Sequence, residues 1–220
     1  FFKHSIYYVH SVKKIAMADT STSKVEHNNG THRILFMRLL KTAFHPEISP
    51  LDISPASNLR LIERHAARAI VLKGENILLL YTERYHDYTL PGGGIDEGED
   101  EVAGLIRELK EETGAKGVRN IKEFARYDEY RPWYKANADI IHMVSYCYVC
   151  DIDEELGETA FESHEVRNGM KPVWINIYEA IAHNEEEISN SEKKGLSIER
   201  ETFLLKVIAE ELVKKDKLQL

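Results

Sequence analysis

The stretch that most constrains the fold of this chain is PGGGIDEGEDEVAGLIRELKEETGA, residues 91–115. Three consecutive glycines lead into a segment whose apolar residues recur at helical spacing. This pattern predicts a glycine loop followed by a helix over about 99–113, with Gly114 ending the helix. The stretch carries eight acidic residues and only two basic ones. Such an excess of negative charge on one helix requires an explanation.

The helical projection divides these residues into two neighbouring arcs at about 100° per residue. One arc is an apolar stripe expected to be buried, formed by Val102, Leu105, Ile106 and Leu109. The other arc carries Glu108, Glu111 and Glu112, with Glu112 at the border of the apolar stripe. Acidic residues 99–101 need no function, because the helix dipole favours anions in a first turn. The three later glutamates lie where the dipole disfavours them, so stability alone would not select them.

Gly104 and the glycine loop predict a divalent cation beside these glutamates. A glycine inside a helix costs about 1 kcal/mol relative to alanine, and Gly104 projects onto the carboxylate face one turn before Glu108. We interpret the missing side chain as space for a cation with its waters. Convergent carboxylates favour Mg²⁺, with Mn²⁺ as a possible substitute. Gly92, Gly93 and Gly94 would let the backbone approach the ligand closely.

Together these residues resemble the Nudix box. The fixed positions match throughout, and only Ala115 is smaller than the usual aliphatic residue. The matching residues are Gly93, Glu99, Arg107, Glu108, Leu109, Glu111, Glu112, Gly114 and Ala115. The resemblance implies an α+β fold, a Nudix-type α/β/α sandwich with a mixed sheet and a loop-helix-loop metal site.

The same resemblance implies roles for individual residues. Glu108 and Glu112 would be metal ligands, and Glu111 a further ligand or a base that orients water. The Gly93 region would offer a backbone carbonyl to the metal. Glu99 and Arg107 would form an orienting ion pair. Family members typically hydrolyse the pyrophosphate bond of a nucleoside diphosphate linked to another moiety, so a small-molecule nucleotide substrate is expected.

The general base could instead come from a later loop. Residues 158–172 supply Glu162, His164 and Glu165, and Glu165 is the favoured candidate. A solvated surface glutamate is the alternative interpretation.

Substrate binding is assigned to an aromatic cluster in ARYDEYRPWYKAN. Tyr130 and Trp133 could stack on a base, and Arg131 could pair with a phosphate. Packing of a strand and its loop is the alternative. Pro132 lies near where ADP-ribose hydrolases of the family often carry a proline. This favours an ADP-ribose or sugar-nucleotide substrate.

The rest of the chain mixes strands and helices without regular alternation. Residues 67–73 and 77–82 form a predicted hairpin around Gly74, and 87–94 form a short extended piece. Further strands are expected over 118–130, 138–152 and 171–177, followed by a helix that begins near 175 and a terminal amphipathic helix over 197–215. This order predicts a mixed sheet with helices on both faces.

The main domain is expected to span 58–220, preceded by an extension over 1–57. Residues 1–16 precede Met17 and are either vector-derived or upstream of the natural start. Residues 18–32 are polar and aperiodic, which predicts a linker. Residues 33–45 have helical spacing and predict a short helix that packs on the domain or mediates a homodimer contact.

Composition limits the partners and the compartment. The net charge of −8 argues against a nucleic-acid polymer or an anionic membrane as main partner. No apolar run reaches the length of a membrane span. Cys147 and Cys150 lie three apart in a predicted strand, so they would face opposite sides and stay unpaired. This favours a reducing compartment, and the cytoplasm is the expected location.

Two other functions remain open at this level. The chain could be a Nudix-fold module that senses a nucleotide without cleaving it. Such modules usually lose box glutamates, whereas this chain keeps all of them. It could also perform different chemistry on a diphosphate, such as isomerisation.

Overall fold

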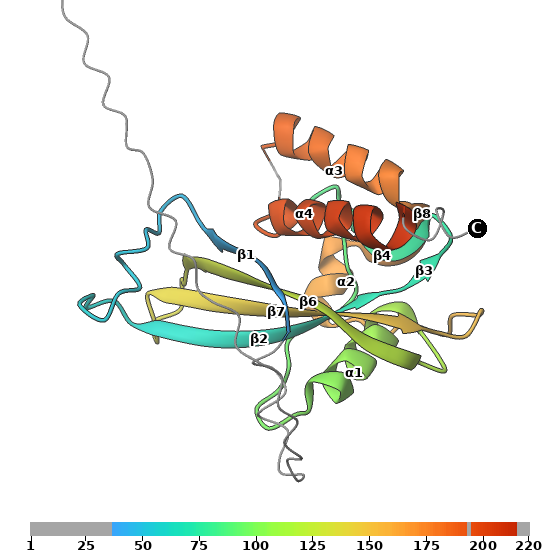
Figure 1. Ribbon diagram of the computed structural model, residues 1–220, viewed down its shortest axis with the longest axis horizontal. Coiled ribbons are helices and arrows are strands. Elements are labelled where there is room, and N and C mark those ends of the chain that lie inside the picture. Colours follow the sequence, from blue (N-terminus) through green and yellow to red (C-terminus); the bar gives the residue numbers. More distant parts are fainter. Residues whose placement is uncertain (1–36, 193–194, 215–220) are drawn as a thin grey trace, which may run out of the picture. The chain divides into compact units, whose positions relative to one another are not determined.

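Two β-sheets form the centre of the computed structural model, which describes residues 37–192 and 195–214 (Figure 1). The first sheet has the strand order β1-β6-β7-β2. Its strands are β1 (Leu39–Phe44), β6 (Arg119–Pro132), β7 (Ile140–Asp151) and β2 (Leu61–Ile70). The second sheet contains β3 (Leu72–Lys73), β4 (Asn76–Thr82) and β5 (Asp87–Thr89), with β8 (Met170–Asn176) paired to β4.

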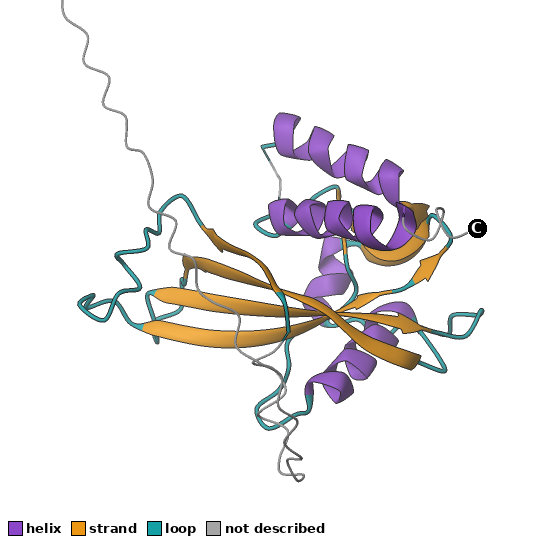
Figure 2. Cartoon of the chain, viewed as in Figure 1, coloured by secondary structure: helices purple, strands orange, loops and turns teal. Residues whose placement is uncertain are grey.

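Within the described residues, four α-helices accompany the sheets; Figure 2 shows the helices in purple. They are α1 (Glu101–Thr113), α2 (Ser163–Asn168), α3 (Ile177–Asn190) and α4 (Ile198–Ile208). A π-helical turn over Ala209–Val213 continues α4. Figure 1 shows α1 on one side of the strands and α3 and α4 on the other. The protein is therefore an α+β sandwich of three layers, as the sequence predicts.

Strand pairing in the first sheet is mixed. β2 pairs in parallel with β7, β1 pairs in parallel with β6, and β6 and β7 are antiparallel neighbours. In the second sheet β3 and β4 form the predicted hairpin, with Gly74 at φ 61° in its turn. The expected mixed sheet is thus confirmed. β2 begins at Leu61 rather than near 67 because its outer half pairs with β7 from Ile140 onward.

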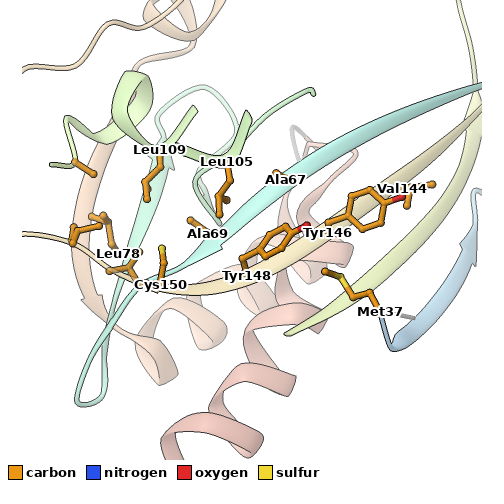
Figure 3. Close-up of a cluster of buried hydrophobic side chains, with 13 residues drawn as sticks. Met37, Ala67, Ala69, Leu78, Leu105, Leu109, Val144, Tyr146, Tyr148 and Cys150 are labelled. Carbon is orange, nitrogen blue, oxygen red and sulfur yellow. The ribbon is translucent and has the colours of Figure 1, made fainter. Parts of the chain in front are cut away.

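The two faces of the sheets carry separate hydrophobic cores. One core joins Leu105 and Leu109 of α1 to strand residues, among them Leu78, Tyr146 and Tyr148 (Figure 3). The other core joins α3 and α4 to the opposite strand faces, with members such as Ile177, Leu204, Ile77 and Leu79. Because side chains alternate along a strand, one run of apolar residues supplies both cores.

The two cysteines follow this alternation. Cys147 belongs to the core under α3 and α4, and Cys150 to the core under α1. Both are free and buried, and burial raises the pKa of each thiol to about 12. The interpretation of the pair as structural residues of a strand is confirmed.

The helix predicted over 33–45 is wrong over its described part, where β1 forms instead. Backbone pairing with β6 outweighs the local helical spacing, and Phe44 stacks on Tyr130 with ring centroids 5.1 Å apart. Although β1 lies before Asn58, it pairs with β6 of the main sheet. The expectations for 1–16, 18–32 and 33–36 lie outside the described residues.

Two further observations concern the second half of the chain. The segment expected to be a loop around Glu165 contains helix α2, which ends at Gly169 with φ 67°. Within the part of the chain that the structure describes, no helix combines the length and apolar character needed to cross a membrane.

Candidate active site

Helix α1 is capped at both ends, by Asp100 at its start and by the predicted Gly114 at its end. The Asp100 side chain accepts hydrogen bonds from the amides of Val102 and Ala103 at 3.0 and 3.1 Å. Gly114 ends the helix with φ 69°. Leu105 and Leu109 are fully buried, but Ile106 is 37% exposed, so the buried stripe is narrower than predicted.

Arg107 joins the start of α1 to the glycine loop. Its guanidinium binds the Glu99 carboxylate through two bonds of 2.8 and 2.9 Å. It also donates to Glu108 at 2.7 Å and to the Gly94 carbonyl at 3.0 Å. The hydrogen bonds from Arg107 lower the pKa of Glu99 to about 2. The expected ion pair between Glu99 and Arg107 is therefore present.

Each of the first two glycines of the loop serves one glutamate of α1. The Gly92 amide donates to Glu112 Oε2 at 2.5 Å. Gly92 has φ 129°, and a Cβ there would collide with the Ala67 backbone. A Cβ on Gly93 would lie 2.5 Å from Glu108 Oε2. Only glycines let both carboxylates approach the loop this closely.

The loop itself is fixed from two directions. On one side β2 bonds to it through Ala67 N to Gly93 O at 3.0 Å and Ala69 N to Pro91 O at 2.8 Å. Arg68 of the same strand donates to the Gly92 carbonyl. On the other side the buried Glu201 of α4 accepts from the Leu90 amide at 2.9 Å.

Burial and mutual repulsion act on the loop-facing carboxylates. Burial raises the pKa of Glu112 to about 8, although the Gly92 amide and Arg68 oppose this, while Glu165 and Glu108 reinforce it. Burial also raises the pKa of Glu108, with Arg107 opposing and Glu111 and Glu165 reinforcing the effect. Glu108, Glu112 and Glu165 thus lie close enough for the charge of one to disfavour ionisation of another.

These three glutamates and the glycine loop line one cleft of about 680 Å³. Of the residues predicted from the sequence, the lining contains Gly92, Gly93, Gly94, Glu108, Glu112, Glu162, His164 and Glu165. It also contains residues that sequence reasoning missed, namely Arg64, Arg68, Thr82, Tyr85, Asp87, Thr89, Lys135, Asn168, Met170 and Ser197.

The structure does not bring Glu111 to this lining. Its side chain is 44% exposed and lies 3.4 Å from Arg107, and it borders a different depression on α1. Arg107 is likewise absent from this lining. It contacts two residues that belong to the lining, Glu108 and Gly94.

The predicted aromatic binding cluster is also absent from the lining of the cleft. Tyr130 is stacked between Phe44 and His142, with centroids 5.1 and 4.3 Å away. Trp133 donates its indole N–H to Asn137 at 2.9 Å, and Arg131 lies 3.9 Å from Glu129. Of this segment, Lys135 reaches the cleft. Strand and loop packing therefore accounts for the cluster.

Gly104 has a different role from the one predicted. A Cβ there would lie 3.0 Å from the Glu99 carboxylate and 3.5 Å from Ile95. The space that the missing side chain leaves is thus filled by Glu99 and Ile95. The glycine permits the Glu99–Arg107 pair rather than the approach of a cation.

The donors in the cleft fit a hard divalent cation by their chemistry. Carboxylate and carbonyl oxygens are the ligands that Mg²⁺ and Mn²⁺ prefer, and Glu108, Glu112 and Glu165 line the same cleft as the glycine loop. Two of these carboxylates also accept hydrogen bonds from neighbouring residues, Glu108 from Arg107 and Glu112 from the Gly92 amide. Among the residues described here, no three or more His, Cys, Asp or Glu side chains are already arranged around a single metal position.

Comparison with known proteins identifies the family of the chain. The NUDIX domain model matches residues 63–194, more than half of the chain. The chain belongs to the NUDIX domain family. In this NUDIX protein, α4 and β1 lie outside the matched residues, although both contact the matched part.

Two curated relatives are RNA pyrophosphohydrolases from Bartonella species. The protein from Bartonella quintana (strain Toulouse) is 52% identical over 42 residues, which is 19% of this chain and 24% of the relative. The protein from Bartonella henselae is 50% identical over 46 residues, covering 21% and 26%. The matched segments span about a quarter of the length of these relatives.

Solved structures with similar folds include two MutT proteins. The MutT NUDIX hydrolase from Burkholderia pseudomallei has 20% identity and a TM-score of 0.40, covering 53% of this chain and 85% of that one. The mutator MutT protein from Bacillus halodurans has 20% identity and a TM-score of 0.44, covering 65% and 80%.

Proposed function

We propose that this NUDIX protein is a metal-dependent pyrophosphohydrolase that cleaves the pyrophosphate bond of a nucleoside diphosphate derivative. The observation that carries the proposal is the convergence of Glu108, Glu112 and Glu165 with the glycine loop in one cleft. Mg²⁺ is the proposed cofactor, with Mn²⁺ as a substitute.

The charges of the cleft support a polyanionic substrate. Arg64, Arg68 and Lys135 line it together with the carboxylates, so phosphate oxygens can find cationic donors from the protein. A divalent cation, when bound, would neutralise charge on the phosphates and lower the pKa of water. Without that neutralisation a cleft rich in carboxylates would repel a diphosphate.

Individual residues take distinct parts in this proposal. Glu108 and Glu112 would hold the cation, and the Gly92 amide keeps Glu112 oriented. Glu165 would accept the proton of the attacking water at its carboxylate. Arg107 would position Glu108 through their 2.7 Å bond. Glu111, which borders another depression, is assigned a supporting role.

ADP-ribose and sugar nucleotides are the proposed substrate class. The names of the Bartonella relatives add RNA as a second candidate substrate. The net charge of −8 argues against a long polymer. A sensing module that does not cleave its ligand is less favoured because the chain retains all the box glutamates.

The test is phosphate-product release from a panel of substrates in Mg²⁺ and in EDTA. The panel contains ADP-ribose, sugar nucleotides, dinucleoside polyphosphates, NADH, coenzyme A, nucleoside triphosphates and 5′-triphosphorylated RNA. Mg²⁺-dependent cleavage of one class supports the proposal and names the substrate. A ligand that raises the melting temperature without being cleaved would instead support the sensing module, and a rearranged product would indicate isomerisation.

A further inference from the structure

We propose that Asp87 forms a second subsite of the cleft, which binds a neutral hydrogen-bond-donating part of the substrate, either a sugar hydroxyl or a base amino group. The inference rests on the proposed function, because it concerns the part of the substrate that lies beyond the pyrophosphate.

Asp87 is a buried carboxylate in the wall of the cleft. It begins β5, directly opposite Thr82 of β4 in the antiparallel register. Only 2% of the residue is exposed, yet it lines the cleft. Within residues 37–192 and 195–214, its Oδ1 atom has no hydrogen-bond partner. Carboxylates are rarely buried in this way unless they are paired.

The Thr82 side chain and the Asp87 backbone form hydrogen bonds with this carboxylate, but they leave its Oδ1 atom unpaired. In the described part of the chain, two charged groups face Asp87. Glu201 repels the carboxylate, and His183 attracts it more weakly than Glu201 repels it. Burial, followed by Glu201, raises the pKa of Asp87 to about 6. At neutral pH the folded protein therefore holds a destabilised, incompletely bonded anion. A ligand in the cleft that donates a hydrogen bond to the Asp87 carboxylate would relieve this deficit.

The distribution of charge in the cleft decides which part of the substrate fits here. The cations Arg64 and Arg68 come from β2, beside the glycine loop, where Arg68 binds the Gly92 carbonyl. Asp87 comes from β5 and has Glu201 as its charged neighbour. A phosphate at this position would add a third anion. A neutral group with O–H or N–H donors fits, because an ionised carboxylate only accepts hydrogen bonds.

The neighbouring side chains suit a neutral polar ligand. Thr82, Tyr85 and Thr89 belong to the same β4–β5 hairpin as Asp87. All three also line the cleft. Thr89 lies two residues after Asp87, on the same strand face. Hydroxyl groups can both donate and accept, so they complement an acceptor at Asp87 when a sugar or a base is bound.

The experiment combines variants of Asp87 with substrate analogues that each lack one donor. The wild type, Asp87→Asn and Asp87→Ala are assayed on the best substrate of the panel. The sugar arm compares it with its 2′-deoxy and 3′-deoxy forms. The base arm compares guanine with hypoxanthine, which lacks the 2-amino group, and adenine with purine, which lacks the 6-amino group. Asp139→Asn is the control, since Asp139 binds Arg60 and is absent from the cleft lining.

The expected result is that removing one substrate donor lowers kcat/KM in the wild type but hardly changes it in Asp87→Ala. In the wild type and in Asp139→Asn, removing the recognised donor lowers kcat/KM by at least about tenfold, the scale of a hydrogen bond to a charged group. In Asp87→Ala the same removal changes kcat/KM by less than about threefold. The arm that shows the effect identifies sugar or base. If both Asp87 variants discriminate every analogue pair as the wild type does, the subsite is refuted.

Failure of the proposed function is recognised separately. If the wild type cleaves no member of the panel, calorimetric titration of ADP-ribose into each protein replaces the kinetic assay. Binding that Asp87→Ala weakens at least tenfold, with Asp139→Asn unchanged, supports the subsite in a protein that is not a hydrolase. Equal binding by Asp87→Ala and wild type, or no binding to the wild type, overturns the subsite.

Discussion

The backbone amide of Gly92 donates to the buried carboxylate of Glu112 across 2.5 Å. The bond joins the glycine loop to the last turn of α1, which is otherwise separated from it by a full helix. The next glycine has a steric role, because Gly93 leaves the space that the Glu108 carboxylate occupies. The loop therefore sets the positions of the two glutamates, and both glycines are needed for their contacts rather than for flexibility.

Gly93→Ala should abolish most of the activity while the protein stays folded. The added Cβ would lie between 2.5 and 2.7 Å from three atoms of the Glu108 carboxyl group, so this side chain must move away from the cleft. We expect kcat to fall by at least about 100-fold, the scale that a displacement of about 1 Å can reach in an active site. Steady-state kinetics measures the loss, and circular dichroism checks the fold.

Gly94→Ala is the matched control. A Cβ at Gly94 meets only the end of the Arg64 side chain, at 3.5 Å, which is an ordinary contact. Its kcat should stay within about threefold of the wild type, because no glutamate is displaced. Equal losses in the two variants would contradict the proposed role of Gly93 as the space for Glu108.

Glu108→Gln and Glu112→Gln should remove activity without loss of stability. Burial raises the pKa of both carboxyl groups, so a neutral amide is no more costly to bury than the ionised group. Binding of Mg²⁺ to the folded state raises the melting temperature by mass action. Each variant should lose this increase together with turnover. Differential scanning fluorimetry with and without Mg²⁺ measures both quantities.

Glu111→Gln serves as the comparison for this pair. The Glu111 side chain is 44% exposed and borders a different depression from the cleft. It should retain most of the Mg²⁺-induced increase in melting temperature. If Glu111→Gln lost the increase as completely as Glu112→Gln, the sequence-based assignment of Glu111 as a ligand would be correct and the lining of the cleft would mislead.

The local features of the site could be predicted because they are encoded in adjacent residues. The end of α1 at Gly114 and the clustering of Glu108 and Glu112 follow from spacing within residues 91–115. The pair Glu99–Arg107 is implied by the resemblance to the Nudix box, which lies in the same residues. The alternation that places Cys147 and Cys150 in separate cores is equally local. In each case the interacting groups lie within a few turns or strand steps of each other.

Features that depend on distant pairing could not be predicted in this way. Residues 39–44 have helical spacing, yet they form β1 because β6 offers a strand edge. The spacing predicts open space beside Gly104, but the Glu99 carboxylate occupies that space in the folded chain. Arg68 and Asp87 escaped notice because a single arginine or aspartate in a strand carries no signal until the fold brings it to the glycine loop or the cleft. The clue for Arg64 and Arg68 is their separation of four residues on one strand, which puts both on one face.

Glu201→Gln should lower turnover through the glycine loop although Glu201 does not line the cleft. Its Oε2 accepts from the Leu90 amide, and its Oε1 binds Arg200 at 2.8 and 3.0 Å. A glutamine has one acceptor oxygen and cannot satisfy both partners. The loop should therefore lose its attachment to α4, a helix outside the family match. We expect kcat to fall about tenfold, the scale of one charged hydrogen bond.

Glu129→Gln separates this effect from a general loss of stability. Glu129 binds the same Arg200 at 2.9 Å from the other side, and it makes no bond to the loop in the described residues. Both variants disturb one buried ion network, so urea unfolding should show similar losses of stability. The expected difference is in kcat, with Glu129→Gln near the wild type. Equal kcat values at equal stability would show that Glu201 has only a structural role.

The last prediction concerns the pH dependence of stability at Asp87. Its pKa in the folded state is about 6, against the ordinary value of 3.8, so the folded protein binds this proton more tightly than the unfolded chain. The contribution of Asp87 to the free energy of unfolding should therefore fall as pH rises from about 4 through 6, and stay level above that. Asp87→Asn lacks this loss. Relative to the wild type, its stability should rise across the same interval by up to about 3 kcal/mol.

Asp139→Asn provides a control of opposite sign. Hydrogen bonding to Arg60 lowers the pKa of Asp139, so the wild type gains stability from this group above its ordinary pKa and loses it as pH falls. Asp139→Asn should thus be less stable than the wild type at neutral pH, and the two should converge in acid. Urea denaturation between about pH 2 and 7 measures all three proteins. A constant difference between Asp87→Asn and the wild type over this range would mean that Asp87 is not the strained carboxylate that the subsite requires.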